Sequence, residues 1–151
     1  MALNKPATAS SQPSRGSPAK KAFDNNAASW WASQPAAPDP QWIAVDIEAV
    51  HRVSAAKIYF SDRFALRFAV QLAVLEGEWR DVNATVDTEE IAGGDNHRIH
   101  RVMFSNVQEA RYARLQLWGT NPHVKAYGER YTPTEFMIIA APDDGGAART
   151  Q

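Results

Sequence analysis

Residues 41–60 read QWIAVDIEAVHRVSAAKIYF, and two parts of this stretch carry the pattern that decides the fold. Residues 42–47 and again residues 53–60 form short, mostly apolar runs in which a polar side chain, such as Asp46 or Lys57, stands between two apolar ones. Successive side chains of a β-strand point to opposite faces, so a period of two predicts strands that each turn one face to a core. We therefore expect two neighbouring strands here.

The same pattern recurs through the rest of the chain, in short apolar runs separated by turn residues. The sequence predicts further strands at residues 67–75, 79–86, 97–104, 110–118 and 134–140. The segment KPATASS near the start suits an edge strand. No long amphipathic helix and no internal repeat appears. This pattern predicts an all-β fold, an antiparallel β-sandwich or jelly roll.

The segment ARYARLQLW illustrates the alternation. Ala113, Leu115 and Leu117 share one face of the expected strand, which places Arg114 and Gln116 on the other. We expect the first set in the core and the second set outside.

Composition narrows the classes of function. The chain has 151 residues, 44% of them hydrophobic and 22% charged, with a formal net charge of -1, as expected for one globular domain. The balanced charge disfavours binding to nucleic acid or an anionic membrane. The absence of cysteine excludes disulfides and thiolate chemistry. No run reaches the length of a membrane-spanning helix, and the first residues lack the apolar core of a signal peptide.

Five blocks in a fixed order carry a family resemblance: NKPATASS, AFDNNAASWWAS, QWIAVDIEAVHRVSAAKIYF, EARYARLQLWG and PTEFMIIA. They resemble the coagulation factor V/VIII type C, or discoidin, superfamily, and most closely the family-32 carbohydrate-binding modules of bacterial glycoside hydrolases. The likeness covers about residues 3 to 140. It implies a galactose-binding-domain-like β-sandwich over residues 1–140, followed by a flexible tail or linker at residues 141–151.

The resemblance also implies a structural calcium ion in the segment AFDNNAAS. Carried over by position, its ligands are the carbonyls of Ala22 and Asn26, the side chain of Asp24, the hydroxyl or carbonyl of Ser29, and Glu135 from TEF. The chemistry is reasonable, because calcium prefers six to eight oxygen ligands and an irregular loop can direct its carbonyls inward. The alternative is an Asx-type turn in which Asp24 caps local amides without an ion.

Two neighbours of these ligands have expected roles of their own. Asn25 stands where the family usually has glycine, and asparagine tolerates the left-handed backbone that such a position requires. In the family the residue at Trp31 belongs to the core beneath the calcium loop.

Sugar-binding residues should come from loops at one end of the sandwich. A pyranose needs a flat aromatic ring for its apolar face and hydrogen-bonding groups for its hydroxyls. Three loops offer such groups: SDRFALR, AGGDNH and WGTNPHVKAYGERY. From them the sequence predicts Arg63 or Arg67 as hydroxyl donor, Tyr127 or Tyr131 as stacking platform, and Asn121 and His123 as polar partners. The alternative for each of these side chains is a place in a solvated rim.

Three functions remain open from the sequence. The first is a non-catalytic, lectin-like carbohydrate-binding module, attached to a secreted glycoside hydrolase and therefore extracellular or periplasmic. The second is a discoidin-type domain that binds lipid or protein through apolar loop tips such as Phe64 and Leu66. The third is a ligand-free structural accessory domain of a hydrolase.

Catalysis finds little support in the sequence. No pair of acidic residues is marked by its spacing as an acid and a base, and no nucleophile elbow or phosphate-binding glycine loop occurs. We therefore expect a binding module and not an enzyme.

Overall fold

The fold is given by a computed structural model of the chain, which describes residues 2–11, 19–25, 31, 40–60, 65–90, 98–120 and 133–142. Within these ranges there are seven strands and one short 3-10 helix, η1. Their bounds in chain order are β1 (Ala7–Ala9), η1 (Ala19–Ala22), β2 (Gln41–Phe60), β3 (Ala65–Ala73), β4 (Arg80–Asp81), β5 (Ala84–Glu90), β6 (Arg98–Thr120) and β7 (Pro133–Ala140). None of the helical residues described here forms a segment suited to crossing a membrane.

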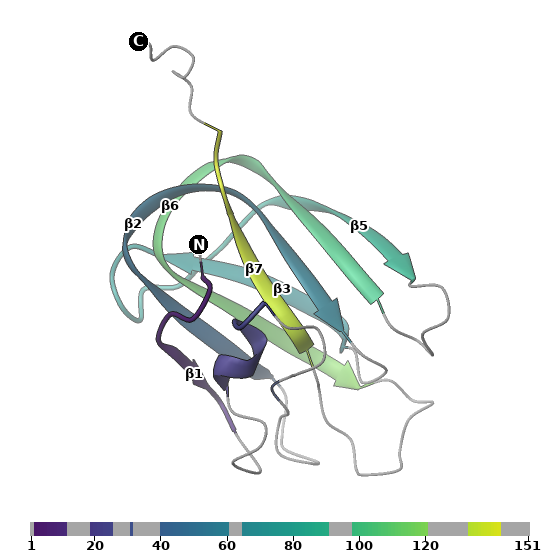
Figure 1. The fold of residues 1–151 in the computed structure, drawn as a ribbon. Coiled ribbons are helices and arrows are strands. Elements are labelled where there is room, and N and C mark those ends of the chain that lie inside the picture. Colours follow the sequence, from purple (N-terminus) through teal and green to yellow (C-terminus); the bar gives the residue numbers. More distant parts are fainter. Residues whose placement is uncertain are drawn as a thin grey trace.

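Two long, bent strands build both layers of a β-sandwich. The first half of β2 pairs with β1 and with the second half of β6, which in turn pairs with β3. The second half of β2 pairs with β7 and with the first half of β6, which pairs with β5. The result is a five-stranded layer, β1-β2-β6-β3-β4, facing a four-stranded layer, β7-β2-β6-β5 (Figure 1). All pairs are antiparallel, as the sequence predicts.

The core lies between the layers and follows the predicted alternation. Ala113, Leu115 and Leu117 are buried, while Arg114 and Gln116 remain half-buried on the outer side. The opposing layer contributes buried rings and aliphatic chains: Phe60, Ile58, Phe136 and Ile138. Burial of these apolar surfaces is the main favourable contribution to folding.

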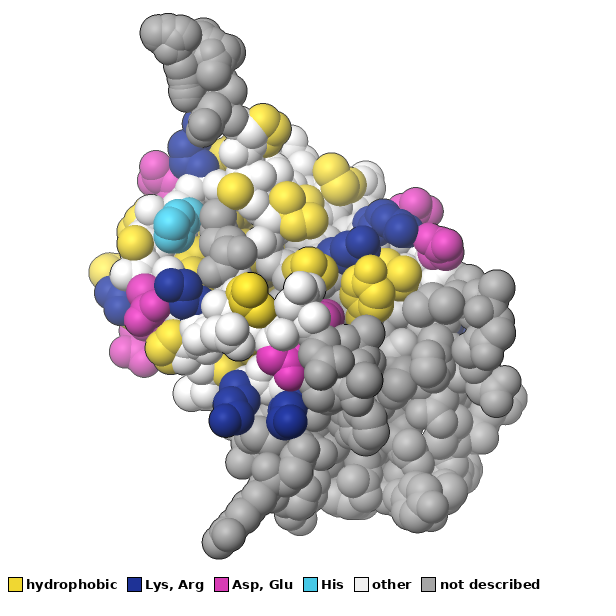
Figure 2. Space-filling view, in the orientation of Figure 1, with side chains coloured by type: hydrophobic (Ala, Val, Ile, Leu, Met, Phe, Trp, Pro, Cys, Tyr) yellow, Lys and Arg dark blue, Asp and Glu magenta, His cyan; other side chains and the backbone are white. Residues whose placement is uncertain are grey.

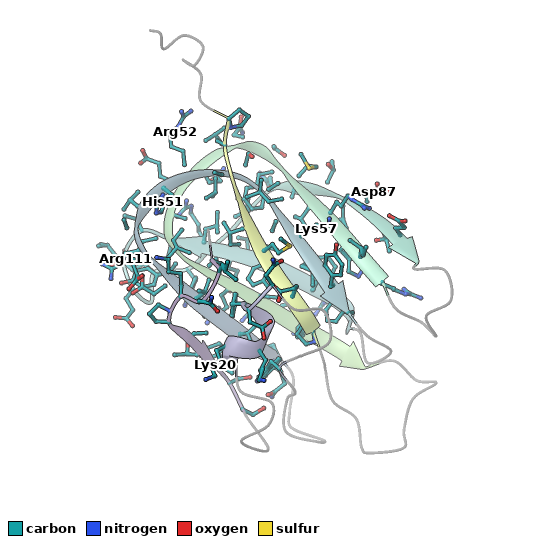
Figure 3. All side chains as sticks on the ribbon, in the orientation of Figure 1. Lys20, His51, Arg52, Lys57, Asp87 and Arg111 are labelled. Atoms are coloured by element: carbon teal, nitrogen blue, oxygen red, sulfur yellow. The ribbon has the colours of Figure 1, made fainter. Side chains whose placement is uncertain are left out.

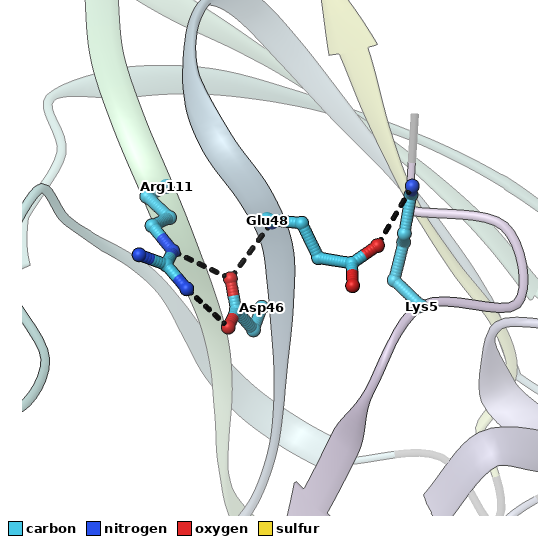
Figure 4. Close-up of polar contacts among 4 residues, drawn as sticks. All are labelled: Lys5, Asp46, Glu48 and Arg111. Carbon is cyan, nitrogen blue, oxygen red and sulfur yellow. Dashed lines mark hydrogen bonds and ion pairs between the residues drawn. The ribbon is translucent and has the colours of Figure 1, made fainter.

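The expectation of separate short strands at residues 42–47 and 53–60 is wrong, because β2 runs through both. The pairing register shifts between Asp46 and His51, and Glu48 adopts a φ of 73° there. Such a bulge turns a strand through a corner while the hydrogen bonding on either side continues. The side chain of Asp46 accepts the Glu48 backbone N–H at 2.7 Å, which holds the turn (Figure 4).

The other predicted strands differ in the same way. Residues 98–104 of the strand expected at 97–104, and residues 110–118, belong to the single strand β6, and the expected strand at 79–86 is divided between β4 and β5. The edge strand expected in KPATASS is present as β1.

Charged side chains surround the bend. Arg111 donates to both carboxylate oxygens of Asp46 at 2.9 Å, and Lys5 donates to Glu48 at 2.9 Å (Figure 4). His51, Arg52 and Arg111 lie together at this curved end of the sandwich, away from Lys57 and Asp87 on the four-stranded layer (Figure 3). The bend thus carries charged side chains whose hydrogen bonds join β2 to β6 and to the segment before β1.

Candidate functional site

The strand ends that carry the three predicted ligand loops meet at the end of the sandwich opposite the bend (Figure 1). In the four-stranded layer, Phe60 pairs with Arg98 and with Pro133, and Arg98 pairs with Glu90. In the five-stranded layer, the start of β3 pairs with the end of β6. The fold therefore brings the anchors of all three loops to one end, as a loop-built binding site requires.

Arg67 is the one predicted ligand residue that lies within the described ranges. Its side chain is exposed, and its guanidinium carbon lies 4.6 Å from the ring centroid of Trp118. The two residues are register partners on β3 and β6, so the stack is set by strand pairing. This places a cation and a flat aromatic ring side by side next to the loop end. The remaining predicted ligand residues lie outside the described ranges: Arg63, Asn121, His123, Tyr127 and Tyr131.

Trp118 is a candidate that the sequence analysis did not name. It follows Arg114 and Gln116 at a spacing of two, on the outer face of β6, and it is half-buried. The alternation in ARYARLQLW is the signal that identifies it, because this stretch ends at Trp118 and places it on the same face as Arg114 and Gln116.

The described part of the predicted calcium loop, residues 22–25, packs against β7. The ring of Phe23 packs on that of Phe136, with centroids 5.9 Å apart, and the Asn4 backbone N–H donates to the Phe23 carbonyl at 2.7 Å. Asn25 adopts a φ of 55°, the left-handed conformation expected where the family has glycine. The early loop and the last strand are therefore neighbours, as the resemblance implies.

Trp31 closes the same region and is fully buried, as expected. Its indole N–H donates to the Ser11 carbonyl at 2.9 Å, and its backbone N–H donates to the Pro133 carbonyl at 3.3 Å. Trp31 thus joins Ser11, which follows β1, to Pro133 at the start of β7.

The proposed metal ligands are only partly within the described residues. Glu135 is 5% exposed and lines a cavity of about 220 Å³ together with Asn25. A carboxylate buried to this extent needs hydrogen bonds or a cation to compensate for its lost hydration. Ala22 is fully buried directly before this turn.

Asp24 lies on a different hollow. It lines a polar groove with Glu48 and three lysines, Lys5, Lys20 and Lys21. Asn26 and Ser29 are outside the described residues. Among the residues that are described, no three His, Asp or Glu side chains form a metal-binding group. A calcium ion here would therefore depend on backbone carbonyls and on an Asp24 carboxylate turned toward Glu135.

His100 is a buried polar residue that the sequence analysis did not single out. It is 6% exposed between Phe60 and Phe68, with ring centroids at 5.7 and 4.7 Å. Its Nδ1 lies 2.8 Å from the Thr88 hydroxyl, whereas its Nε2 is buried without a hydrogen-bond partner. Burial, and secondarily the charge of Arg98, lower the pKa of His100 below its usual value.

The outer face of the four-stranded layer carries a contact of Lys57 with the Tyr59 ring, with the ammonium nitrogen 5.2 Å from the ring centroid. Figure 2 shows hydrophobic side chains interspersed with basic and acidic ones on this side. Met103 and Ile139 are exposed, and Arg101 pairs with Glu89 at 2.9 Å. This mixed surface gives no geometry for a particular ligand.

Comparison with known proteins agrees with this architecture. Residues 6–131 match the model of the F5/8 type C domain family. Among curated proteins, none matches this sequence.

Several solved structures share the fold. Chitosan-binding module 1 of a chitosanase/glucanase from Paenibacillus sp. IK-5 has 27% identity and a TM-score of 0.74, covering 92% of this chain and 97% of that one. Module 2 of the same enzyme, in complex with chitotriose, has the same identity and TM-score, with 92% and 98% covered. The family 32 module of NanJ from C. perfringens, in complex with galactose, has 18% identity and a TM-score of 0.68, with 89% and 93% covered.

These similar structures are carbohydrate-binding modules, and the family match spans most of the sequence. The chain belongs to the F5/8 type C domain family.

Proposed function

We propose that this domain is a non-catalytic carbohydrate-binding module, stabilised by calcium, that directs an attached glycoside hydrolase to its glycan or polysaccharide. The observation that carries the proposal is the Arg67–Trp118 stack at the end of the sandwich where the three loops are anchored. A guanidinium beside an indole provides hydrogen-bond donors for hydroxyls and a flat apolar surface for a pyranose ring.

The likeness to the chitosan-binding modules supports the same class of ligand. Those modules cover nearly all of this chain at 27% identity, so the comparison concerns the whole domain and not a fragment of it. A module of this kind acts by raising the local concentration of substrate near a tethered enzyme, even when each contact is weak. Attachment to a hydrolase, and an extracellular or periplasmic location, are parts of this proposal.

The loop residues complete the proposed site. Arg67, or Arg63 from the same sequence segment, donates to sugar hydroxyls; Tyr127 or Tyr131 stacks on the ring; Asn121 and His123 provide further polar contacts. Because a pyranose needs both kinds of contact, removal of the aromatic platforms should abolish binding and removal of one donor should weaken it.

Calcium is proposed as a structural ion, held by the carbonyls of Ala22 and Asn26, by Ser29, and by the carboxylates of Asp24 and Glu135. The packing of Phe23 on Phe136 and the left-handed turn at Asn25 support a loop held against β7. Glu135 is buried on β7, where it lines a cavity together with Asn25.

A glycan array probed in calcium-containing buffer tests the sugar-binding proposal. The wild-type domain should bind one class of glycan, and the Tyr127→Ala/Tyr131→Ala variant should bind none. Absence of binding to every glycan by the folded wild-type domain would refute it, and binding to liposomes in place of glycans would favour the discoidin-type alternative.

A further inference from the structure

Three of the five tryptophans gather on the outer face of the five-stranded layer. Trp42 alternates with buried residues of β2, and its register partner Gln116 lies two residues before Trp118 on β6. Trp79 directly precedes β4. All three indoles are half-buried, so each keeps an exposed part that the core does not use.

Two arginines hold these rings. The Arg114 guanidinium carbon lies 4.6 Å from the Trp79 ring centroid and 5.7 Å from that of Trp42. The Arg67 guanidinium carbon lies 4.6 Å from the ring centroid of Trp118, which follows Arg114 by four residues on β6. These distances are within the range of cation–π contacts, which orient both partners.

Polar side chains fix Arg114 in place. Its Nε donates to Gln71 Oε1 at 2.8 Å, and the amide nitrogen of Gln71 donates to Asp81 at 2.8 Å. Only one of the five N–H donors of Arg114 is used in this bond. We call the surface formed by Trp42, Trp79, Trp118, Arg67, Arg114 and Gln71 the aromatic face.

The aromatic face carries two guanidinium groups, those of Arg67 and Arg114. One carboxylate, that of Asp81, is hydrogen-bonded to its Gln71. Within the described residues neither Arg67 nor Arg114 forms an ion pair, whereas Arg101 and Arg111 elsewhere on the molecule each pair with a carboxylate. Guanidinium groups bind carboxylates through two parallel hydrogen bonds, which gives both strength and orientation. Charge complementarity therefore favours an anionic ligand.

We propose that the aromatic face is a second carbohydrate-binding surface, which binds a polysaccharide chain that carries uronate carboxylates. Between Arg114 and Trp118 the β6 backbone advances about 13 Å. This length exceeds that of one sugar ring and accommodates consecutive rings of a chain. Indoles separated along a flat sheet match the apolar faces of successive pyranoses, and the arginines match their carboxylates.

The aromatic face also continues the loop site. Arg67 and Trp118 stand at the loop end of the sandwich, and Trp42, Trp79 and Arg114 extend from there along the sheet. A chain bound at the loops would thus meet the aromatic face directly. The inference rests on the proposed function in that both assign a sugar ligand and share Arg67 and Trp118, but Trp42, Trp79 and Arg114 belong to the aromatic face alone.

Affinity electrophoresis in gels that contain polygalacturonate tests this inference with the full chain. Wild-type protein should be retarded, and Trp42→Ala/Trp79→Ala should weaken the apparent affinity at least about tenfold. Tyr59→Ala is the matched control, because Tyr59 forms a similar stack with Lys57, at 5.2 Å, on the other layer. It should be retarded like the wild type. Circular dichroism of each variant confirms folding, and Arg114→Gln, which keeps the indoles, serves if the double variant does not fold.

Methyl-esterified polygalacturonate removes the charge while keeping the sugar chain. The inference predicts at least about tenfold weaker binding to the ester, because Arg67 and Arg114 lose their carboxylate partners. Equal retardation by acid and ester would overturn the assignment of an anionic ligand. Unchanged retardation of both Trp42→Ala/Trp79→Ala and Arg114→Gln would overturn the aromatic face itself.

The loop variant separates this inference from the proposed function. If Tyr127→Ala/Tyr131→Ala loses binding on the glycan array but is still retarded by polygalacturonate, the two surfaces act independently and both proposals stand. If that variant loses both activities while the aromatic-face variants retain both, the second surface is refuted and the loop site stands. A blank array with polygalacturonate binding that depends on Trp42 and Trp79 would refute the loop site alone.

Discussion

The ring of Phe23 packs against the ring of Phe136, with centroids 5.9 Å apart, and so joins the segment after η1 to the last strand. Both rings are almost completely buried. The residues that follow Phe23 and precede Phe136 in the chain are Asp24 and Glu135, so this contact determines where the proposed calcium ligands can lie.

Replacing Phe23 by alanine should lower the free energy of unfolding by about 3–5 kcal/mol, because it removes a buried ring and leaves a cavity beside Phe136. Urea unfolding monitored by tryptophan fluorescence gives this value. Val86→Ala, at a side chain 50% exposed, is the control and should change it by less than about 0.5 kcal/mol. A loss as small as that of the control would show that the packing does not hold the segment.

Removal of calcium should destabilise the domain. At a calcium concentration of 100 times Kd, binding to the folded state alone contributes about 2.7 kcal/mol, which corresponds to roughly 5–10 °C in Tm for a domain of this size. Differential scanning calorimetry with calcium and then with EDTA measures the shift. Glu135→Gln and Asp24→Asn should abolish it, while Asp87→Asn, an exposed position on β5, should not. Identical Tm values with calcium and EDTA would refute the calcium proposal without affecting sugar binding.

His100 should make stability depend on pH. Burial lowers its pKa in the folded state below the usual 6.5, so between these two pKa values the unfolded chain binds more protons than the folded one. The free energy of unfolding should therefore be highest above pH 6.5 and fall as the pH drops through 6.5 toward the folded pKa. Urea titrations between pH 8 and pH 5 measure this slope.

The variant His100→Phe keeps an aromatic ring between Phe60 and Phe68 and should reduce that slope. His51→Ala, at the half-buried position near the bend, should leave it in place. A slope in this pH range that is the same in all three proteins would assign it to other groups.

Asp46 should stabilise the bend through Arg111. The hydrogen bonds from Arg111 lower the pKa of the Asp46 carboxyl below 3.8, so the folded state favours the carboxylate. This contribution is present above the unfolded pKa and is lost as the pH falls through the folded one. Asp46→Asn should therefore lower Tm modestly at pH 7, and the difference from wild type should shrink as the pH falls below 3.8. A difference that persists undiminished at pH 2 would contradict the role of the charge.

The layers and the core were accessible from the sequence because they depend on local alternation. The period of two in ARYARLQLW placed Leu115 and Leu117 inside and Arg114 outside, as the structure has them. The continuity of β2 was not accessible, because the corner depends on a left-handed residue at Glu48, a type that gives no local signal for such a conformation.

The aromatic face could not be predicted from local patterns in the sequence. Trp42, Trp79 and Arg114 come from three different parts of the chain, and only the pairing register of β2, β3 and β6 brings them together. The family resemblance implies a binding site in the loops and gives no indication of a site on the sheet surface. By contrast, the buried Trp31 and the left-handed Asn25 agree with what the resemblance implied.

The most direct test of the account is the glycan array with calcium, followed by isothermal titration with any glycan that binds. The account predicts saturable binding of one class of sugar, lost in Tyr127→Ala/Tyr131→Ala and weakened in Arg67→Gln, with all proteins folded to the same extent. A folded wild-type domain that binds no glycan on the array would contradict its assignment as a carbohydrate-binding module.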